Sequence, residues 1–216
     1  MGSKLYYNTV SPLLLRILKT LMSAMEFDSF RLVGGTALSL LRGHRESLDI
    51  DLFTDSDYDS VDFDLIDSFL RKSYSYVDTY DYPVIGMGKS YFVGKNKDNS
   101  IKLDLYYTEK FIQVIQLIDD IRFATIEEII AMKINVISNG GRKKDFWDIH
   151  ELKDDYSLDN MLAFYRERYL NDPDPKKIKK SMTNFKIADD DFDPICLKGK
   201  HWEIIKLDLI DFVKRS

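Results

Sequence analysis

The segment Ser47–Phe53 limits the possible folds of this chain more than any other segment. Polar and apolar positions alternate through it, and Asp49 and Asp51 fall on the polar side. The apolar positions are Leu48, Ile50 and Leu52. Because successive side chains of a β-strand point to opposite faces, the alternation predicts a strand with one buried face. Both carboxylates then project together from the other face of a sheet.

A glycine pair precedes this strand. Phe30–Val33 reads as a short strand that ends at Gly34-Gly35, and a helix is expected to open at Thr36 and to close near Gly43. Glycine lets backbone amides approach an anion closely, and a helix N-terminus favours negative charge. The Thr36 hydroxyl offers a further contact. A Gly-Gly pair alone is more often a simple tight turn, but with Asp-x-Asp downstream it indicates a phosphate site.

A third aspartate lies on another predicted strand. Ser100–Tyr107 alternates in the same way and places Asp104 on its polar face. Hard divalent cations such as Mg²⁺ prefer carboxylate oxygens as ligands. Asp49, Asp51 and Asp104 therefore predict a Mg²⁺ site beside the predicted phosphate site.

The apolar period changes to that of helices in the second half of the chain. Thr125–Glu128 has the form of a capping box, and apolar residues then recur three or four positions apart as far as Ile137. The pattern predicts an α+β protein in which strands and helices come first and a mainly helical C-terminal part follows. We place the boundary between a core of residues 1–115 and a helical domain of residues 116–216.

A lysine interrupts the apolar stripe of the first of these C-terminal helices. Lys133 must either extend its amine to solvent or face a carboxylate or phosphate, because an unpaired buried charge is costly. Asp145 and Asp148 lie three positions apart on one face of the next helix, and Lys144 neighbours them. Such an arrangement suits an ion-pair network that orients Lys133. The aromatic residues expected in the core are Phe146 and Trp147.

Composition excludes several classes of partner and chemistry. A single cysteine, Cys196, indicates a reducing compartment. The net charge of −5 gives no general attraction to nucleic acid, so such a partner needs a local basic patch. The one dense run, more often a solvated face, is Lys176, Lys177, Lys179 and Lys180. No P-loop, dinucleotide fingerprint, Ser-His-Asp order or zinc-type histidine pair is present, which argues against kinase, Rossmann, hydrolase and zinc readings.

The N-terminal apolar segment does not read as a membrane span or a signal peptide. Arg16 and Lys19 interrupt the run Pro12–Met25, and no small-residue cleavage site follows it. Its apolar spacing instead predicts an amphipathic helix with Ser11 as N-cap. We therefore expect a cytoplasmic protein with no membrane partner.

Two separate blocks of the sequence resemble a known family. Leu32-Val33-Gly34-Gly35, thirteen further residues and then Asp49-Ile50-Asp51-Leu52 resemble the signature of the polymerase-beta-type nucleotidyltransferase superfamily. Gly34–Leu38 and Arg45–Phe53 resemble its AbiEii/AbiGii abortive-infection toxin branch. Lys133, followed by Arg142–Leu152, is similar to the second block of that branch. The resemblance covers the chain from Leu32 to Leu152.

The resemblance implies a nucleotidyltransferase core at residues 1–115 with a mixed β-sheet and flanking helices, followed by a mainly helical C-terminal part. It also implies transfer of a nucleoside monophosphate from NTP to an acceptor. In this toxin branch the acceptor includes RNA, with tRNA in some members, and the toxin has a cognate antitoxin. A protein is the other acceptor that we consider for this chain. The resemblance also implies roles for individual residues. Metal would bind Asp49, Asp51 and Asp104; the catalytic set would add Lys133 and Asp148; and the nucleotide would contact Gly34, Gly35, Thr36, Lys144 and Asp145.

Two other functions remain open at the level of sequence. The same chemistry could act on a small acceptor such as an aminoglycoside, although the second block favours the toxin branch. Alternatively, the chain could be a nucleotide-binding or partner-binding module without turnover. The intact carboxylates argue against that module.

Overall fold

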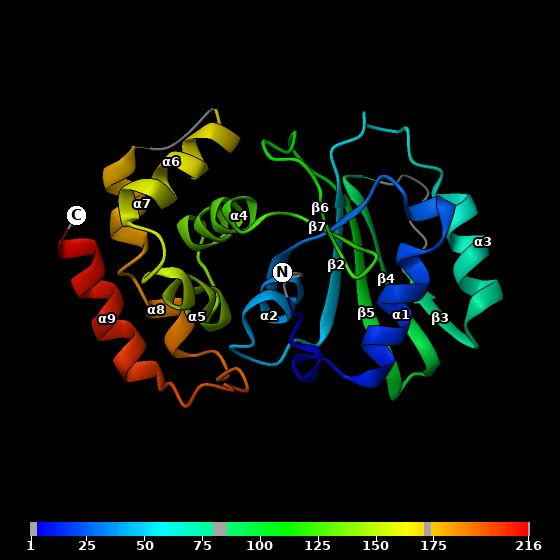
Figure 1. The fold of residues 1–216 in the computed structure, drawn as a ribbon, viewed down its shortest axis with the longest axis horizontal. Helices are drawn as coiled ribbons and strands as arrows, with labels where there is room; N and C mark the ends of the chain where they lie inside the picture. Colours follow the sequence, from blue (N-terminus) through cyan, green and yellow to red (C-terminus); the bar gives the residue numbers. More distant parts are fainter. Residues whose placement is uncertain (1–3, 80–85, 171–173, 216) are drawn as a thin grey trace.

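A seven-stranded mixed sheet forms one half of the molecule and helices form the other half (Figure 1). The computed structural model describes residues 4–79, 86–170 and 174–215. The strands are β1 (Arg31–Leu32), β2 (Asp49–Thr54), β3 (Tyr76–Thr79), β4 (Gly88–Asn96), β5 (Asn99–Tyr107), β6 (Gln116–Ile118) and β7 (Ile121–Phe123). The sheet order is β3-β4-β5-β2-β1-β7-β6.

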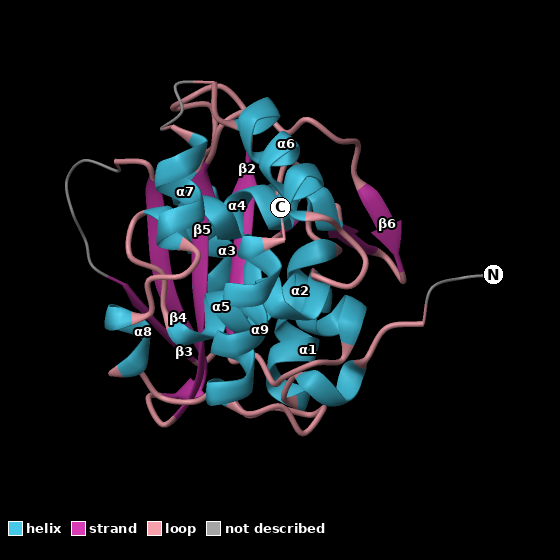
Figure 2. Cartoon of the chain, turned by 90° about the vertical axis from the view of Figure 1, so that its left-hand side faces the viewer, coloured by secondary structure: helices cyan, strands magenta, loops and turns pink. Residues whose placement is uncertain are grey.

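Helices flank the sheet on both sides. The α-helices are α1 (Pro12–Met22), α2 (Gly34–Arg42), α3 (Phe63–Ser73), α4 (Ile126–Ser138), α5 (Lys143–Leu152), α6 (Leu158–Arg168), α7 (Pro175–Ser181), α8 (Lys186–Asp189) and α9 (Trp202–Lys214). In Figure 1, α1 and α3 lie on one side of the sheet, while α2 lies on the other side, next to the helical half. The helical half is made of α4 to α9, and Figure 2 shows it in front of the strands. The expected α+β class is confirmed.

Local signals in the sequence set the helix ends. The Ser11 side chain accepts a hydrogen bond from the Leu14 amide at 3.1 Å, and Pro12 occupies the first position of α1. Gly43 ends α2 with a φ of 66°, a left-handed conformation that favours glycine. The Thr125 side chain caps α4. These ends confirm the helices expected from capping and turn residues.

Strand register places the three predicted metal ligands on one face. β2 and β5 are parallel neighbours, with Asp51 opposite Asp104. Ile50 and Leu52 of β2 are fully buried on the opposite face. The expectation that Leu48 lies on the buried face is wrong, because β2 begins only at Asp49 and the Leu48 side chain is exposed.

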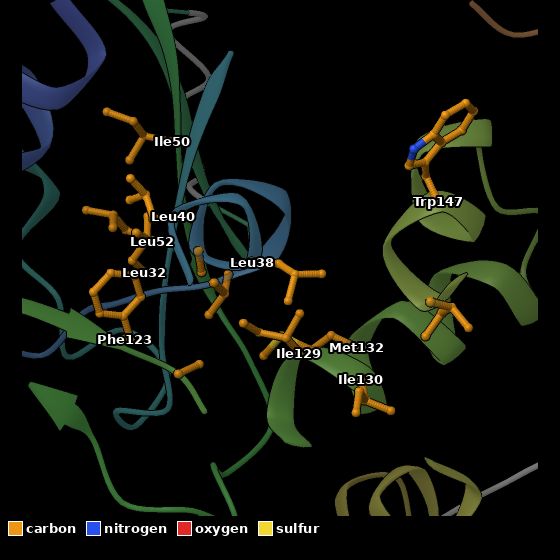
Figure 3. Close-up of a cluster of buried hydrophobic side chains, with 14 of the residues drawn as sticks. Leu32, Leu38, Leu40, Ile50, Leu52, Phe123, Ile129, Ile130, Met132 and Trp147 are labelled. Carbon is orange, nitrogen blue, oxygen red and sulfur yellow. The ribbon is translucent and has the colours of Figure 1, made fainter. Parts of the chain in front are cut away.

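One continuous core joins the sheet to the helical half. Figure 3 shows buried side chains of the sheet and α2 lying next to those of α4. Full burial of one such side chain contributes about 1.5–3 kcal/mol to folding. Phe146 and Trp147 are buried as expected, and Trp147 stacks on Trp202 with ring centroids 6.3 Å apart. The helices therefore form a fixed wall opposite the polar face of β2.

The sheet continues beyond the predicted boundary at residue 115. β7 pairs in parallel with β1, and β6 pairs with β7, so both strands lie C-terminal to that boundary. The division into 1–115 and 116–216 remains a prediction. The lysine run is on α7. Of the described helices, none has the length and apolar character needed to span a bilayer.

Candidate active site

Asp51 is a carboxylate whose surroundings disfavour its charged form. Burial, together with the negative charges of Asp104 and Asp49, raises its pKa to about 6, although Lys133 and Lys144 oppose the shift. A carboxylate held in this way gains from a cation placed next to it. The alternation of β2 accounts for the contribution of Asp49, since it sets Asp49 and Asp51 on one face, and the pairing of β2 with β5 brings Asp104 opposite Asp51.

Asp104 is adjacent to Asp51 but already has two partners. Its Oδ1 accepts a hydrogen bond from Ser90 Oγ at 2.6 Å, and its Oδ2 lies 2.6 Å from Lys102 Nζ. Ser90 reaches it from β4, which pairs with β5. Asp104 therefore stands at the correct register for a third carboxylate, with an ammonium group in contact with it.

The glycine turn lies against these carboxylates. Gly34 has a φ of 67°, and a Cβ atom added to it would lie 2.7 Å from Asp51 Oδ2. A Cβ atom on Gly35 would lie 2.3 Å from Arg45 Nη2. Both glycines are therefore required by close approach. Val33, the N-cap residue of α2, makes no side-chain capping bond, so the first amides of α2 remain available to an anion.

Alanine substitutions at Gly34 and Gly199 distinguish the effect of the contact with Asp51 from the effect of backbone strain. We expect Gly34→Ala to lower activity about 100-fold, because displacement of a catalytic group by an ångström has effects of that order. Gly199→Ala is the matched control: its φ is 65°, but no atom lies within 4 Å of the added Cβ. Backbone strain should cost both variants about 1 kcal/mol of stability, and only Gly34→Ala should also displace Asp51. Equal activity of the two variants in an NTP-transfer assay would contradict the role of Gly34.

Thr36 is not brought to the cavity. Its side chain is buried, and its hydroxyl donates to the backbone carbonyl of Asp49 and contacts Ser47 Oγ at 2.8 Å. The hydroxyl thus ties α2 to the start of β2. The predicted contact of Thr36 with phosphate receives no support from this geometry, because the group is used within the protein.

Lys133 is buried and paired with two carboxylates. Its Nζ lies 2.7 Å from Asp145 Oδ1 and 2.7 Å from Asp148 Oδ2. Burial lowers the pKa of Lys133, but Asp148 and Asp145 outweigh it and raise the pKa above its ordinary value. Lys133 is therefore charged at neutral pH, and the network expected from the sequence is present.

Asp148 is fully buried behind Lys133 and holds two residues that the sequence did not single out for a role. Arg45 donates from Nε and Nη2 to its two oxygens at 2.7 and 2.9 Å, and His44 Nε2 lies 2.8 Å from Oδ1. Despite burial, Arg45 and Lys133 hold the pKa of Asp148 well below its usual range. Asp148 contacts these cations and does not line the cavity. It acts as the anchor of the network.

A cavity of about 290 Å³ lies between the glycine turn, β2 and the helical wall. The charged residues that line it are Asp49, Asp51, Lys133, Arg142, Lys144 and Asp145. Lys144 Nζ lies 3.8 Å from Asp49 Oδ2. Arg142 was not predicted as a site residue, although it directly precedes the Lys144–Asp148 cluster. The cavity therefore combines two carboxylates that could bind a metal ion, Asp49 and Asp51, with three cationic side chains that could bind phosphate. These are Lys133, Arg142 and Lys144.

Sequence comparison decides the family. The model of the family described as "Nucleotidyl transferase AbiEii toxin, Type IV TA system" matches residues 16–210. The chain belongs to the AbiEii nucleotidyltransferase toxin family. As an AbiEii family member it is a nucleotidyltransferase, and a type IV toxin–antitoxin system implies a cognate antitoxin. No curated protein matches the sequence.

Solved structures share the AbiEii fold. A protein from H. pylori, provisionally described as a nucleotidyltransferase, has a TM-score of 0.59 at 21% identity and covers 94% of this chain and 90% of its own. JHP933 from Helicobacter pylori gives 0.57 at 20%, covering 94% and 88%. MenT4, a nucleotidyltransferase toxin from Mycobacterium tuberculosis H37Rv, gives 0.54 at 12%, covering 92% and 80%. At these identities the likeness concerns the fold.

The carboxylates of this AbiEii chain fit a divalent cation in donor type and environment. Asp49 and Asp51 offer hard oxygen ligands, and the raised pKa of Asp51 marks a place where a cation would be stabilising. Glycine at position 34 keeps the space beside Asp51 open. Within residues 4–79, 86–170 and 174–215, no three His, Cys, Asp or Glu side chains converge as a ready metal site. Because Asp104 is paired with Lys102, Asp49 and Asp51 are the first candidates for metal ligands.

Proposed function

We propose that this protein is an Mg²⁺-dependent nucleotidyltransferase that transfers NMP from NTP to an RNA acceptor, tRNA included. We further propose that it acts as the toxin of a toxin–antitoxin pair in abortive infection. The observation that carries the proposal is the single cavity where the glycine turn, Asp49, Asp51 and the buried Lys133 meet. Family membership supports the same conclusion.

The chemistry requires positioning and charge neutralisation more than covalent participation by the protein. The acceptor hydroxyl attacks the α-phosphorus, a new P–O bond forms, and the bond to the β-phosphate oxygen breaks to release pyrophosphate and a proton. Asp49 and Asp51 would hold Mg²⁺, which supplies charge neutralisation and activation of the attacking hydroxyl. Asp104 would be the third carboxylate beside that hydroxyl once Lys102 releases it.

The sheet order supports a direction for the two substrates. Gly34 follows β1 on one side of β2, whereas Asp104 is on β5 at the other side. The triphosphate would lie against α2, where Lys133 and Lys144 would neutralise part of its negative charge. The acceptor would approach over β5. In-line attack fits this arrangement, because nucleophile and leaving group then lie on opposite sides of the α-phosphate.

A labelling screen tests the proposed activity. The protein is incubated with each α-labelled NTP, with Mg²⁺ or with EDTA, and with total RNA, protein extract or aminoglycosides as acceptors. We expect label in RNA, dependent on Mg²⁺. Label in aminoglycosides alone would favour the small-molecule transferase. Stabilisation by NTP without transfer to any acceptor would favour a non-catalytic module.

A further inference from the structure

A second cavity, of about 380 Å³, adjoins the first and shares part of its lining. The residues common to the two cavities are Ser47, Asp49, Arg142 and Lys144. Asp49 therefore stands at the junction, with the glycine turn on one side and the second cavity on the other. If the triphosphate occupies the first cavity with its α-phosphate at Asp49, the ribose and the base extend through the junction into the second cavity.

The second cavity is lined by both charged and apolar side chains. Asp49, Arg142 and Lys144 line it at the junction. Its other charged lining residues are Arg45, Glu46, Asp191 and Asp193, and its apolar lining residues are Leu48, Phe192, Pro194 and Ile195. The Phe192 side chain is 92% exposed, and Leu48 is also exposed. An exposed ring next to a phosphate-type site is the arrangement that proteins use to stack nucleobases.

The segment that carries Phe192 is fixed on both sides of the ring. This segment, residues 190–197, follows α8 in the connection to α9 and is orange in Figure 1. Asp191 accepts two hydrogen bonds from Arg142, each at 3.1 Å, and Asp193 lies 2.8 Å from Lys143 Nζ. Ordering a loop costs conformational entropy, so a platform that is already fixed loses less on binding.

Backbone hydrogen bonds also tie this segment to the chain that leads into β2. The Glu46 amide donates to the Ile195 carbonyl at 2.9 Å, and the Leu197 amide donates to the His44 carbonyl at 2.9 Å. The wall with Phe192 therefore moves with the segment that positions Asp49. A ligand in the second cavity would be held in register with the reacting phosphate.

We propose that this second cavity is the nucleoside site of the NTP and that Phe192 is its stacking platform. The assignment rests on the proposed nucleotidyl transfer, since it extends the same site from phosphate to base. Stacking accepts any base, so all four NTPs depend on Phe192 to a similar degree. Inorganic tripolyphosphate, which has no base, would bind in the first cavity only.

Binding measurements with both probes test the assignment. Calorimetry with Mg²⁺ compares each NTP with tripolyphosphate on wild-type protein and on Phe192→Ala, Phe192→Leu and Phe192→Tyr. We expect Phe192→Ala and Phe192→Leu to weaken NTP binding about tenfold or more, Phe192→Tyr to retain it, and tripolyphosphate binding to be unchanged in all. Leu207→Ala, an exposed apolar substitution on α9, is the control for surface changes.

The outcomes separate this assignment from the proposed function. Unchanged NTP affinity in Phe192→Ala, or an equal loss for tripolyphosphate, would overturn the stacking role while leaving nucleotidyl transfer intact. Failure of the wild-type protein to bind either probe would overturn both. Loss of NTP affinity in Phe192→Leu with retention in Phe192→Tyr would support a role for the ring itself.

Discussion

Asp51→Asn is expected to abolish transfer of label from α-labelled NTP, by about a thousandfold or more, while the protein remains folded. The amide is nearly isosteric with the carboxylate but cannot supply the negative oxygen that a divalent cation requires. Loss of one preorganised charge in an active site alone has effects of about 100-fold to 1,000-fold, and the cation would be lost as well. Label transfer to RNA in the presence of Mg²⁺ is the measurement.

The same substitution should raise stability above pH 6. The pKa of Asp51 is about 6 in the folded protein against an ordinary value of 3.8. The folded state therefore binds this proton more tightly than the unfolded state, and stability falls as pH rises from about 4 to about 6. One pKa unit corresponds to about 1.4 kcal/mol, so ionised Asp51 costs about 3 kcal/mol. Asn carries no charge and avoids this cost.

Melting temperatures at two pH values check the prediction for stability. Relative to wild type, Asp51→Asn should melt higher at pH 8 and at a similar temperature at pH 4. Asp211→Asn provides the control, because Asp211 is exposed on α9. Transfer activity in Asp51→Asn close to that of wild type would refute the assignment of Asp51, whatever its melting temperature.

The sequence predicted those parts of the site that depend on local order. Alternation in β2 fixes the common face of Asp49 and Asp51, and the glycine pair fixes the start of α2. Helical spacing likewise places Asp145 and Asp148 together. Each of these pairs of residues lies within a few positions of the sequence, so the periodicity of the local sequence is enough to predict that they share a face.

Relations between distant segments were not predictable in the same way. Arg45 meets Asp148 across 103 positions of the chain, and nothing in either local pattern marks the pair. The β-bridge between Arg45 and Cys196 brings Phe192 to the site by the same kind of long-range packing. Leu48 and Thr36 show the converse. Leu48 was predicted as a strand position, but β2 begins only at Asp49. Thr36 was correctly predicted as a helix position, but its hydroxyl is used by Asp49 and Ser47 and does not reach the cavity.

Asp148→Asn is expected to destabilise the fold by about 3–5 kcal/mol, the usual cost of removing one partner of a buried ion pair. Asp148 is completely buried, and Lys133 and Arg45 would keep their charges with one carboxylate fewer to balance them. Desolvation decides the size of the effect, because Lys133 and Arg45 are almost fully buried and water replaces the lost partner poorly. The midpoint of urea unfolding is the measurement.

Asp208→Asn is the matched control for this substitution. Asp208 also pairs with a histidine of α5, His150, at 2.8 Å, but its side chain is 41% exposed. An exposed pair contributes at most about 1 kcal/mol, so the two variants should differ several-fold in their effect. If Asp148→Asn cost no more than Asp208→Asn, the buried network would not hold the two halves together. Asp148 links α5 to Lys133 of α4 and to Arg45, in the segment that leads into β2. We therefore expect its loss also to change the distance between Lys133 and the carboxylates of β2.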